Sequence, residues 1–155
     1  MSVSFDLARA GDLPQLVELL GILFAQEAEF APDPEKQLRG LRLVMEDPAT
    51  GWICVAREGA RVLGMVSILR SVSTAEGGPA GQLEDLVVRP ECRGRGIGSR
   101  LLAYAVEQAS DDGLLRLTLL TDGDNARAQR LYERAGFRPS GMRPMRLRLR
   151  RSGDT

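Results

Sequence analysis

The sequence contains the stretch Arg93-Gly94-Arg95-Gly96-Ile97-Gly98-Ser99, which separates a predicted strand from a predicted helix. The apolar residues 83–88 precede it. After it, apolar residues recur at helical spacing at Ile97, Leu101, Leu102, Ala105, Val106 and Ala109. The first turn of such a helix has backbone N–H groups without partners and a positive dipole end. Glycines let phosphates approach the backbone, and the two arginines add forked donors. This pattern indicates a pyrophosphate-binding turn.

Two common nucleotide-binding patterns do not fit this turn. A P-loop ends in Gly-Lys-Ser/Thr, whereas the single lysine of the chain, Lys36, is far away. A dinucleotide fold uses Gly-x-Gly-x-x-Gly near the start of a βαβ unit, whereas Gly94, Gly96 and Gly98 are evenly spaced. A tight turn with solvated arginines is the remaining alternative.

A second motif spans residues 125–137, Asn-Ala-Arg-Ala-Gln-Arg-Leu-Tyr-Glu-Arg-Ala-Gly-Phe. Asn125, Ala128 and Tyr132 are three and four residues apart and share one face of a predicted helix. On this face, the side-chain amide of Asn125 can hydrogen-bond to an amide of a ligand, and the small side chain of Ala128 leaves space for that ligand. Tyr132 places its phenol at the far end of the same face. Helix capping by Asn125 and core packing of Tyr132 are the structural alternatives.

The order Arg93-x-x-Gly96-x-Gly98 followed by Asn125-x-x-Ala128-x-x-x-Tyr132 resembles the GNAT (GCN5-related N-acetyltransferase) superfamily over essentially the whole chain. The resemblance implies a mixed α/β fold in the order β-α-α-β-β-β-α-β-α-β-β, with the fourth and fifth strands splayed apart. The pattern along the chain agrees with that order. We expect strands over 3–8, 52–57, 61–69, 83–88 and 115–121, one from Phe137 and a last over 142–149, and helices over 13–26, 34–47, 97–111 and 125–135. Residues 71–81 are rich in serine, glycine and proline, and we expect a loop there.

The same resemblance implies acetyl-CoA as the cosubstrate, bound between the splayed strands. Its pantetheine arm would pair with the backbone of Leu86 and Val88 as an added strand. The backbone N–H groups of the glycine turn would bind its pyrophosphate. The residues expected to bind acetyl-CoA are Leu86, Val87, Val88, Arg93, Gly94, Arg95, Gly96, Ile97, Gly98, Ser99, Asn125, Ala128 and Tyr132.

Acetyl transfer to an amine makes three chemical demands. An alkylamine with a pKa near 10.4 is only about 0.04% neutral at pH 7, so a base helps. The family position favours Glu84 as that base, with Asp85 or a water molecule left open, because neighbouring strand residues face opposite sides unless a bulge intervenes. A backbone N–H of Leu86 or Val87 would stabilise the oxyanion. Tyr132 matches the family position of the acid that protonates the thiolate.

The acceptor amine is less well defined. The predicted connection between the first two helices is acidic, and Glu27 and Glu29 are the candidate substrate-binding residues for a small cationic amine. A solvated loop is the alternative reading of that cluster. A protein N-terminus or lysine is a second acceptor class, and a non-catalytic acyl-CoA-binding regulatory domain is a third possibility. The presence of Tyr132 argues against that domain.

Composition narrows the remaining classes. The 155 residues suit one domain over 1–150, with a frayed tail over 151–155. Equal numbers of basic and acidic residues, 21 each, argue against nucleic-acid binding. The chain has no histidine, so we expect no metal and no histidine-based catalysis, and no apolar run suits a membrane span. We expect a cytoplasmic protein, with a homodimer left open.

Overall fold

The computed structural model describes residues 2–150. The chain divides into two compact units, Met1–Leu119 and Leu120–Thr155, and each is described by itself. The single domain over 1–150 stays a prediction, and the frayed tail over 151–155 lies outside the described residues.

The first unit is built on a five-stranded sheet in the order β1-β2-β3-β4-β5. Its strands are β1 (Ser4–Leu7), β2 (Gly51–Glu58), β3 (Arg61–Ser73), β4 (Gly78–Val88) and β5 (Leu117–Leu119). Strands β1 to β4 are antiparallel, and β5 runs parallel to β4. A parallel neighbour requires a crossover, which α3 (Ile97–Asp111) supplies.

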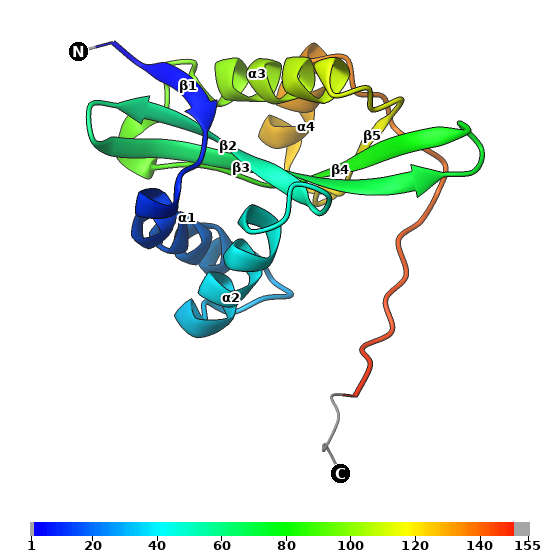
Figure 1. Cartoon of the computed structure of the whole chain (residues 1–155), viewed down its shortest axis with the longest axis horizontal. Helices are drawn as coiled ribbons and strands as arrows, with labels where there is room; N and C mark the ends of the chain where they lie inside the picture. Colours follow the sequence, from blue (N-terminus) through cyan, green and yellow to red (C-terminus); the bar gives the residue numbers. More distant parts are fainter. Residues whose placement is uncertain (1, 151–155) are drawn as a thin grey trace. The chain divides into compact units, whose positions relative to one another are not determined.

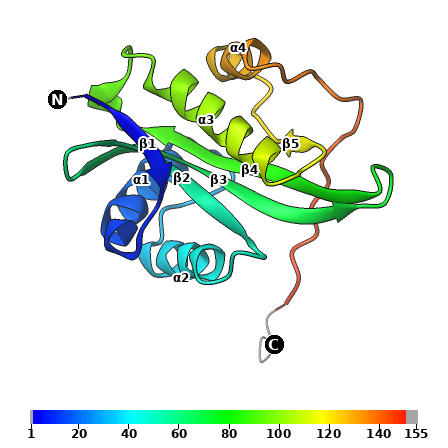
Figure 2. The same ribbon diagram turned by 45° about the horizontal axis from the view of Figure 1, so that its top comes forward.

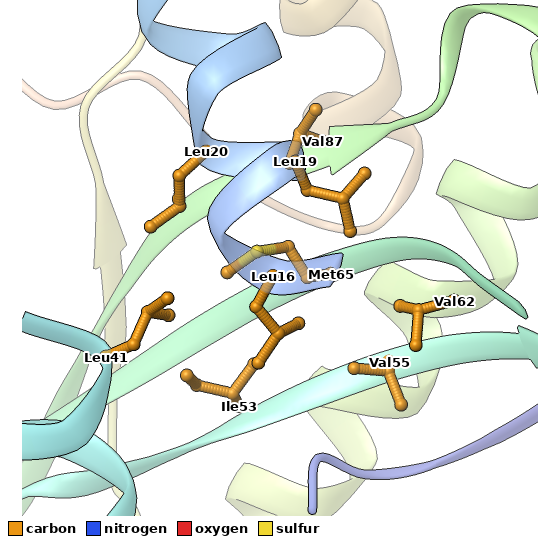
Figure 3. Close-up of a cluster of buried hydrophobic side chains, with 9 residues drawn as sticks. All are labelled: Leu16, Leu19, Leu20, Leu41, Ile53, Val55, Val62, Met65 and Val87. Carbon is orange, nitrogen blue, oxygen red and sulfur yellow. The ribbon is translucent and has the colours of Figure 1, made fainter. Parts of the chain in front are cut away.

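Helices α1 (Leu13–Gln26) and α2 (Pro34–Met45) cover one face of the sheet, and α3 covers the other (Figures 1 and 2). The short helix η1 (Ala10–Asp12) precedes α1. On the first face, leucines of α1 point at apolar side chains of the strands (Figure 3). The cluster consists of Leu16, Leu19, Leu20, Leu41, Ile53, Val55, Val62, Met65 and Val87. Each such side chain contributes about 1.5–3 kcal/mol when fully buried, so this cluster holds α1 against β2, β3 and β4.

Strand β5 pairs along all three of its residues with the first half of β4. The ladder joins Gly81 to Leu117 and ends at the pair Leu83–Leu119, whereas β4 continues to Val88. The predicted splay of the fourth and fifth strands is therefore present, and beyond Leu83 the described ladder gives β4 no partner on its β5 side.

The expectation of a loop over residues 71–81 is wrong. Strand β3 continues to Ser73 and β4 begins at Gly78, so most of this segment forms a hairpin with Ser71 opposite Ala80 and Ser73 opposite Gly78. Serine, glycine and proline have low strand propensity, but ladder pairing with a long neighbouring strand outweighs it.

The second unit contains α4 (Ala126–Arg134) and the segment that follows it. Helix α4 confirms the helix predicted over 125–135. The two strands predicted from Phe137 and over 142–149 are wrong, because residues 137–150 form neither strand nor helix. Met142, Met145, Leu147 and Leu149 are 79–94% exposed, so their alternation with arginine buries no face. Alternation favours a strand only where a neighbouring strand accepts its backbone hydrogen bonds.

Candidate active site

The glycine turn leads from β4 into α3. The short helix η2 (Pro90–Cys92) follows β4, and Gly94 and Gly96 then adopt φ angles of +83° and +74°. These left-handed angles favour glycine. Gly96 is the N-cap of α3 and no side chain caps the helix, so the N–H groups of its first turn face outward. A Cβ placed on either glycine meets nothing within 4 Å, so a ligand can approach the backbone there.

The two arginines of the turn have different surroundings. Arg95 donates to the Glu58 carboxylate at 2.9 Å, which raises the pKa of Arg95 and lowers that of Glu58. Arg93 is exposed at the start of the turn. The predicted positive charge is therefore present, but Glu58 offsets the part that Arg95 carries.

Strand β4 contains a bulge at the position of the predicted base. Ser67 pairs with Glu84 and Met65 pairs with Val87, so Asp85 and Leu86 together oppose the single residue Val66. Asp85 has φ +57°, the only positive φ angle of a non-glycine residue among residues 2–150. A bulge redirects side chains, and backbone strain of this kind clusters at functional sites.

The bulge brings three of the acidic candidates together. Glu84 accepts a hydrogen bond from Gln82 Nε2 at 3.0 Å. Asp85 is half-buried, and burial first, then the nearby carboxylates of Glu84 and Glu27, raise its pKa from 3.8 to about 7. Glu27 follows the last residue of α1, whereas Glu29 lies two residues further along the connection to α2. A carboxyl group with a pKa near neutrality is suited to general-base work.

The acidic connection between α1 and α2 also has a structural function. Asp33 caps α2 by accepting from the Lys36 N–H at 3.2 Å, and its own N–H donates to Gln37 Oε1 at 2.7 Å. The solvated-loop reading therefore accounts for Asp33. Glu27, at the other end of the connection, contributes to the raised pKa of Asp85.

Leu86, Val87 and Val88 lie where β4 has left β5. The Val87 side chain belongs to the core beside Leu19 (Figure 3), so only its backbone can serve a ligand. The N–H and C=O groups on the β5 side of residues 84–88 have no ladder partner. An extended amide chain could pair there as an added strand, as the resemblance implies.

The second motif lies on α4, in the second unit. The Asn125 side chain caps α4 by accepting from the Ala128 N–H at 3.1 Å, which is the structural alternative that the sequence left open. The Tyr132 ring packs edge-on against Phe137, with centroids 6.0 Å apart. Contact of Asn125, Ala128 and Tyr132 with acetyl-CoA stays a prediction.

The cysteines do not suit nucleophilic catalysis. Cys54 and Cys92 are buried, and burial raises the pKa of the Cys54 thiol to about 12. A thiol with such a pKa is not a nucleophile at neutral pH.

Within residues 2–150, no group of three or more His, Cys, Asp or Glu side chains could hold a metal ion, and no helix is long and apolar enough to cross a membrane.

Comparison with known proteins identifies the family. Residues 14–137, which include both motifs, match the acetyltransferase (GNAT) family. The chain belongs to this family. The predicted resemblance is thereby confirmed.

Individual relatives agree with the family. The chain is 35% identical over 97 residues to the aminoalkylphosphonate N-acetyltransferase of Salmonella typhimurium, a match covering 63% of this chain and 62% of the relative. The chain thus spans less than two thirds of that protein. An integron cassette protein from the mobile metagenome of Cole Harbour Salt Marsh has a TM-score of 0.82 at 30% identity, over 95% of this chain and 91% of the other.

A predicted acetyltransferase from Clostridium acetobutylicum, solved with acetyl-CoA, has a TM-score of 0.76 at 16% identity over 94% of this chain and 96% of the other. That likeness shows the fold alone. Together with the family match, these structures confirm the predicted mixed α/β GNAT fold class.

Sequence reasoning missed the arrangement around Asp85. It preferred Glu84 as the base from the family position and left Asp85 open, and it allowed for a bulge without locating one. Glu27 is far from Asp85 along the chain, so its effect on the pKa of Asp85 arises only when the chain folds. One local signal was available, because aspartate tolerates left-handed φ angles better than most residues.

Proposed function

We propose that this protein transfers an acetyl group directly from acetyl-CoA to a primary amine, and that the amine is a small cation. The observation that carries the proposal is the position of the uncapped glycine turn at the end of a bulged strand that has left its neighbour. The strand edge suits the amides of pantetheine, and the helix N-terminus suits a diphosphate.

The base in this proposal is Asp85, with Glu84 as the alternative. With a pKa of about 7, the Asp85 carboxyl group is deprotonated in a large share of molecules at neutral pH and still accepts a proton well. It takes the proton of the attacking amine, directly or through a water molecule. The new C–N bond forms as the C–S bond of the thioester breaks.

Two other groups complete the transfer. A backbone N–H of Leu86 or Val87 stabilises the oxyanion, because strand pairing on the β5 side ends before these residues. The family position assigns Tyr132, in the second unit, the protonation of the departing thiolate, and this role stays a prediction. A phenol with a pKa near 10 is a competent donor to a thiolate whose conjugate acid has a pKa near 8.5.

The cationic acceptor is supported by the carboxylates that gather at the bulge. The carboxylates of Glu84 and Glu27 both raise the pKa of Asp85 there. The Salmonella relative is named an aminoalkylphosphonate N-acetyltransferase. A small amine that also carries an anionic group is therefore a second candidate acceptor. A protein N-terminus or lysine stays an alternative acceptor class, and a non-catalytic acyl-CoA-binding domain stays the alternative outside enzymes. Cytoplasmic location stays a prediction.

The test is acetyl-CoA turnover by the purified protein with a panel of acceptors. The panel contains polyamines, neutral primary amines, aminoalkylphosphonates and peptides with free N-termini or lysines, and mass spectrometry identifies the N-acetyl product. We expect acetylation of polyamines above the other classes. Preference for peptides would favour the second acceptor class. Binding of acetyl-CoA without turnover of any acceptor would favour the non-catalytic domain.

A further inference from the structure

The segment that carries the glycine turn is tied to the hairpin between β2 and β3. Glu91 of η2 forms an ion pair with Arg61, and Arg95 of the turn pairs with Glu58. All four side chains are between one quarter and about one half exposed, and exposed pairs of this kind contribute little. They do not by themselves fix the turn.

Arg89 makes a stronger attachment. It follows the last residue of β4 and precedes η2, and its side chain is only 11% exposed. Its Nε donates to the Val62 carbonyl oxygen at 2.7 Å, and its Nη2 donates to a Glu18 carboxylate oxygen at 2.9 Å. Its backbone N–H donates to the Leu63 carbonyl oxygen at 2.8 Å. A planar guanidinium that meets two acceptors has little freedom to move.

Gln15 of α1 extends the attachment into the hairpin. Its Oε1 accepts from the Val62 N–H at 2.7 Å and lies 3.4 Å from Arg89 Nη2, and its Nε2 donates to the Ala60 carbonyl oxygen at 3.0 Å. Arg89, Gln15 and Glu18 thus join the end of β4, α1 and the start of β3 in one network. The glycine turn leaves the sheet directly from this network.

We infer that Arg89 is a positioning residue for the pyrophosphate-binding turn. It fixes where β4 ends and therefore where the N–H groups of the first turn of α3 point. The inference rests on the proposed function, because it assigns Arg89 a purpose only if the turn binds the diphosphate of acetyl-CoA. Arg89 acts through the backbone of the turn and has no contact with the acetyl group in this role.

The experiment compares two acyl donors, acetyl-CoA and S-acetylpantetheine, of which only the first has a diphosphate. The ratio of kcat/KM for the two donors reports the contribution of the nucleotide end. In Arg89→Met we expect this ratio to fall by about 10–100-fold, the range in which a small misplacement of binding groups costs rate. This lower ratio should come from a higher KM for acetyl-CoA, while kcat stays within a fewfold of the wild-type value.

Arg57→Met is the matched control. Arg57 is 12% exposed and equally engaged, but its bonds go to Asp12, which directly precedes α1, and to Asp6 of β1. This variant should lower thermal stability while keeping the donor ratio of the wild type. Arg89→Lys keeps the charge beside Glu18 without the planar fork, and it should lower the ratio a fewfold even if Arg89→Met does not fold.

The outcomes separate the two levels of the proposal. Equal losses with both donors in Arg89→Met, or an unchanged ratio in both Arg89 variants, would overturn the positioning role and leave the proposed function intact. Equal use of both donors by the wild-type protein would show that the turn does not bind a diphosphate. It would then overturn both the proposed pyrophosphate site and the role of Arg89.

Discussion

Asp85 combines a left-handed backbone with a carboxyl group whose pKa lies near neutrality. Burial disfavours its anion, and the carboxylates of Glu84 and Glu27 add repulsion. Glu84 has a hydrogen-bonding neighbour in Gln82.

The first prediction concerns the pH profile. The base form of Asp85 is its anion, so kcat/KM of the wild type should rise with pH through about 7 as the proton leaves. Asp85→Asn keeps a side chain that tolerates the left-handed φ angle and removes the base. It should abolish the limb near pH 7, lower kcat by about 10²–10⁴-fold and leave only the rise caused by the amine itself. Steady-state rates at pH 5.5–9 measure this.

Glu84→Gln is the comparison for Asp85→Asn. If Asp85 is the base, removing the neighbouring charge lowers the pKa of Asp85, so the limb should shift to lower pH while kcat stays within about tenfold of the wild type. The opposite result, loss of the limb in Glu84→Gln and its retention in Asp85→Asn, would assign the base to Glu84.

Tyr132 gives a second prediction at this scale. Tyr132→Phe removes one hydroxyl group and keeps the ring that packs against Phe137, so the protein should fold and bind acetyl-CoA as before. If the phenol protonates the thiolate, kcat should fall by about 10²–10⁴-fold. Pre-steady-state kinetics would establish whether the chemical step limits turnover, and calorimetry would measure the affinity for acetyl-CoA. A rate within twofold of the wild type would show that another group supplies the proton.

At the scale of elements, the turn from β4 into α3 depends on glycine for its backbone and for open space. Gly96→Glu strains the left-handed φ angle and places a carboxylate where the diphosphate is expected. We predict loss of acetyl-CoA binding by at least about 10²-fold, measured by calorimetry on a variant whose circular dichroism matches the wild type.

Gly113→Glu separates strain from obstruction. Gly113 has φ +85° just beyond the opposite end of α3, and a Cβ placed on it also meets nothing within 4 Å. The two substitutions therefore strain the backbone to a similar degree, but only the first lies at the predicted diphosphate site. Equal acetyl-CoA affinity in the two variants would show that the turn does not bind the diphosphate.

The elements also show where sequence reasoning reached its limit. Periodicity and glycine spacing predicted α3, its turn and α4, because those features are local. The β3–β4 hairpin and the bulge at Asp85 depend on pairing between strands, which composition does not report. The alternating segment 142–149 has a strand pattern, yet it forms no ladder among the described residues and its apolar side chains are exposed. An alternating sequence pattern identifies candidate strands, whereas the presence of a free sheet edge decides whether a candidate forms a strand.

At the scale of the whole molecule, equal numbers of acidic and basic residues leave no net charge to attract or repel a ligand over long distances. Any electrostatic preference for a cationic amine must therefore arise from an uneven distribution. Half-buried Glu27 and exposed Glu29 lie near the end of α1, and Glu27 is close enough to Asp85 on β4 to raise its pKa. The acidic patch formed by Glu27 and Glu29 is the candidate source of such a preference.

The last prediction tests that patch by its salt dependence. Because exposed charges are screened beyond about 8 Å at physiological ionic strength, kcat/KM for a polyamine should fall by about tenfold as salt rises from about 0.01 to 0.15 M. Replacing Glu27 and Glu29 by Gln should flatten that fall and raise KM for cationic amines, with KM for acetyl-CoA unchanged. Replacing Glu107 and Asp111 by Gln and Asn on α3, which covers the opposite face of the sheet, is the matched control and should keep the wild-type salt dependence. If the first double variant treats cationic and neutral amines as the wild type does, the patch is solvated surface. The acceptor is then selected by other walls of the site.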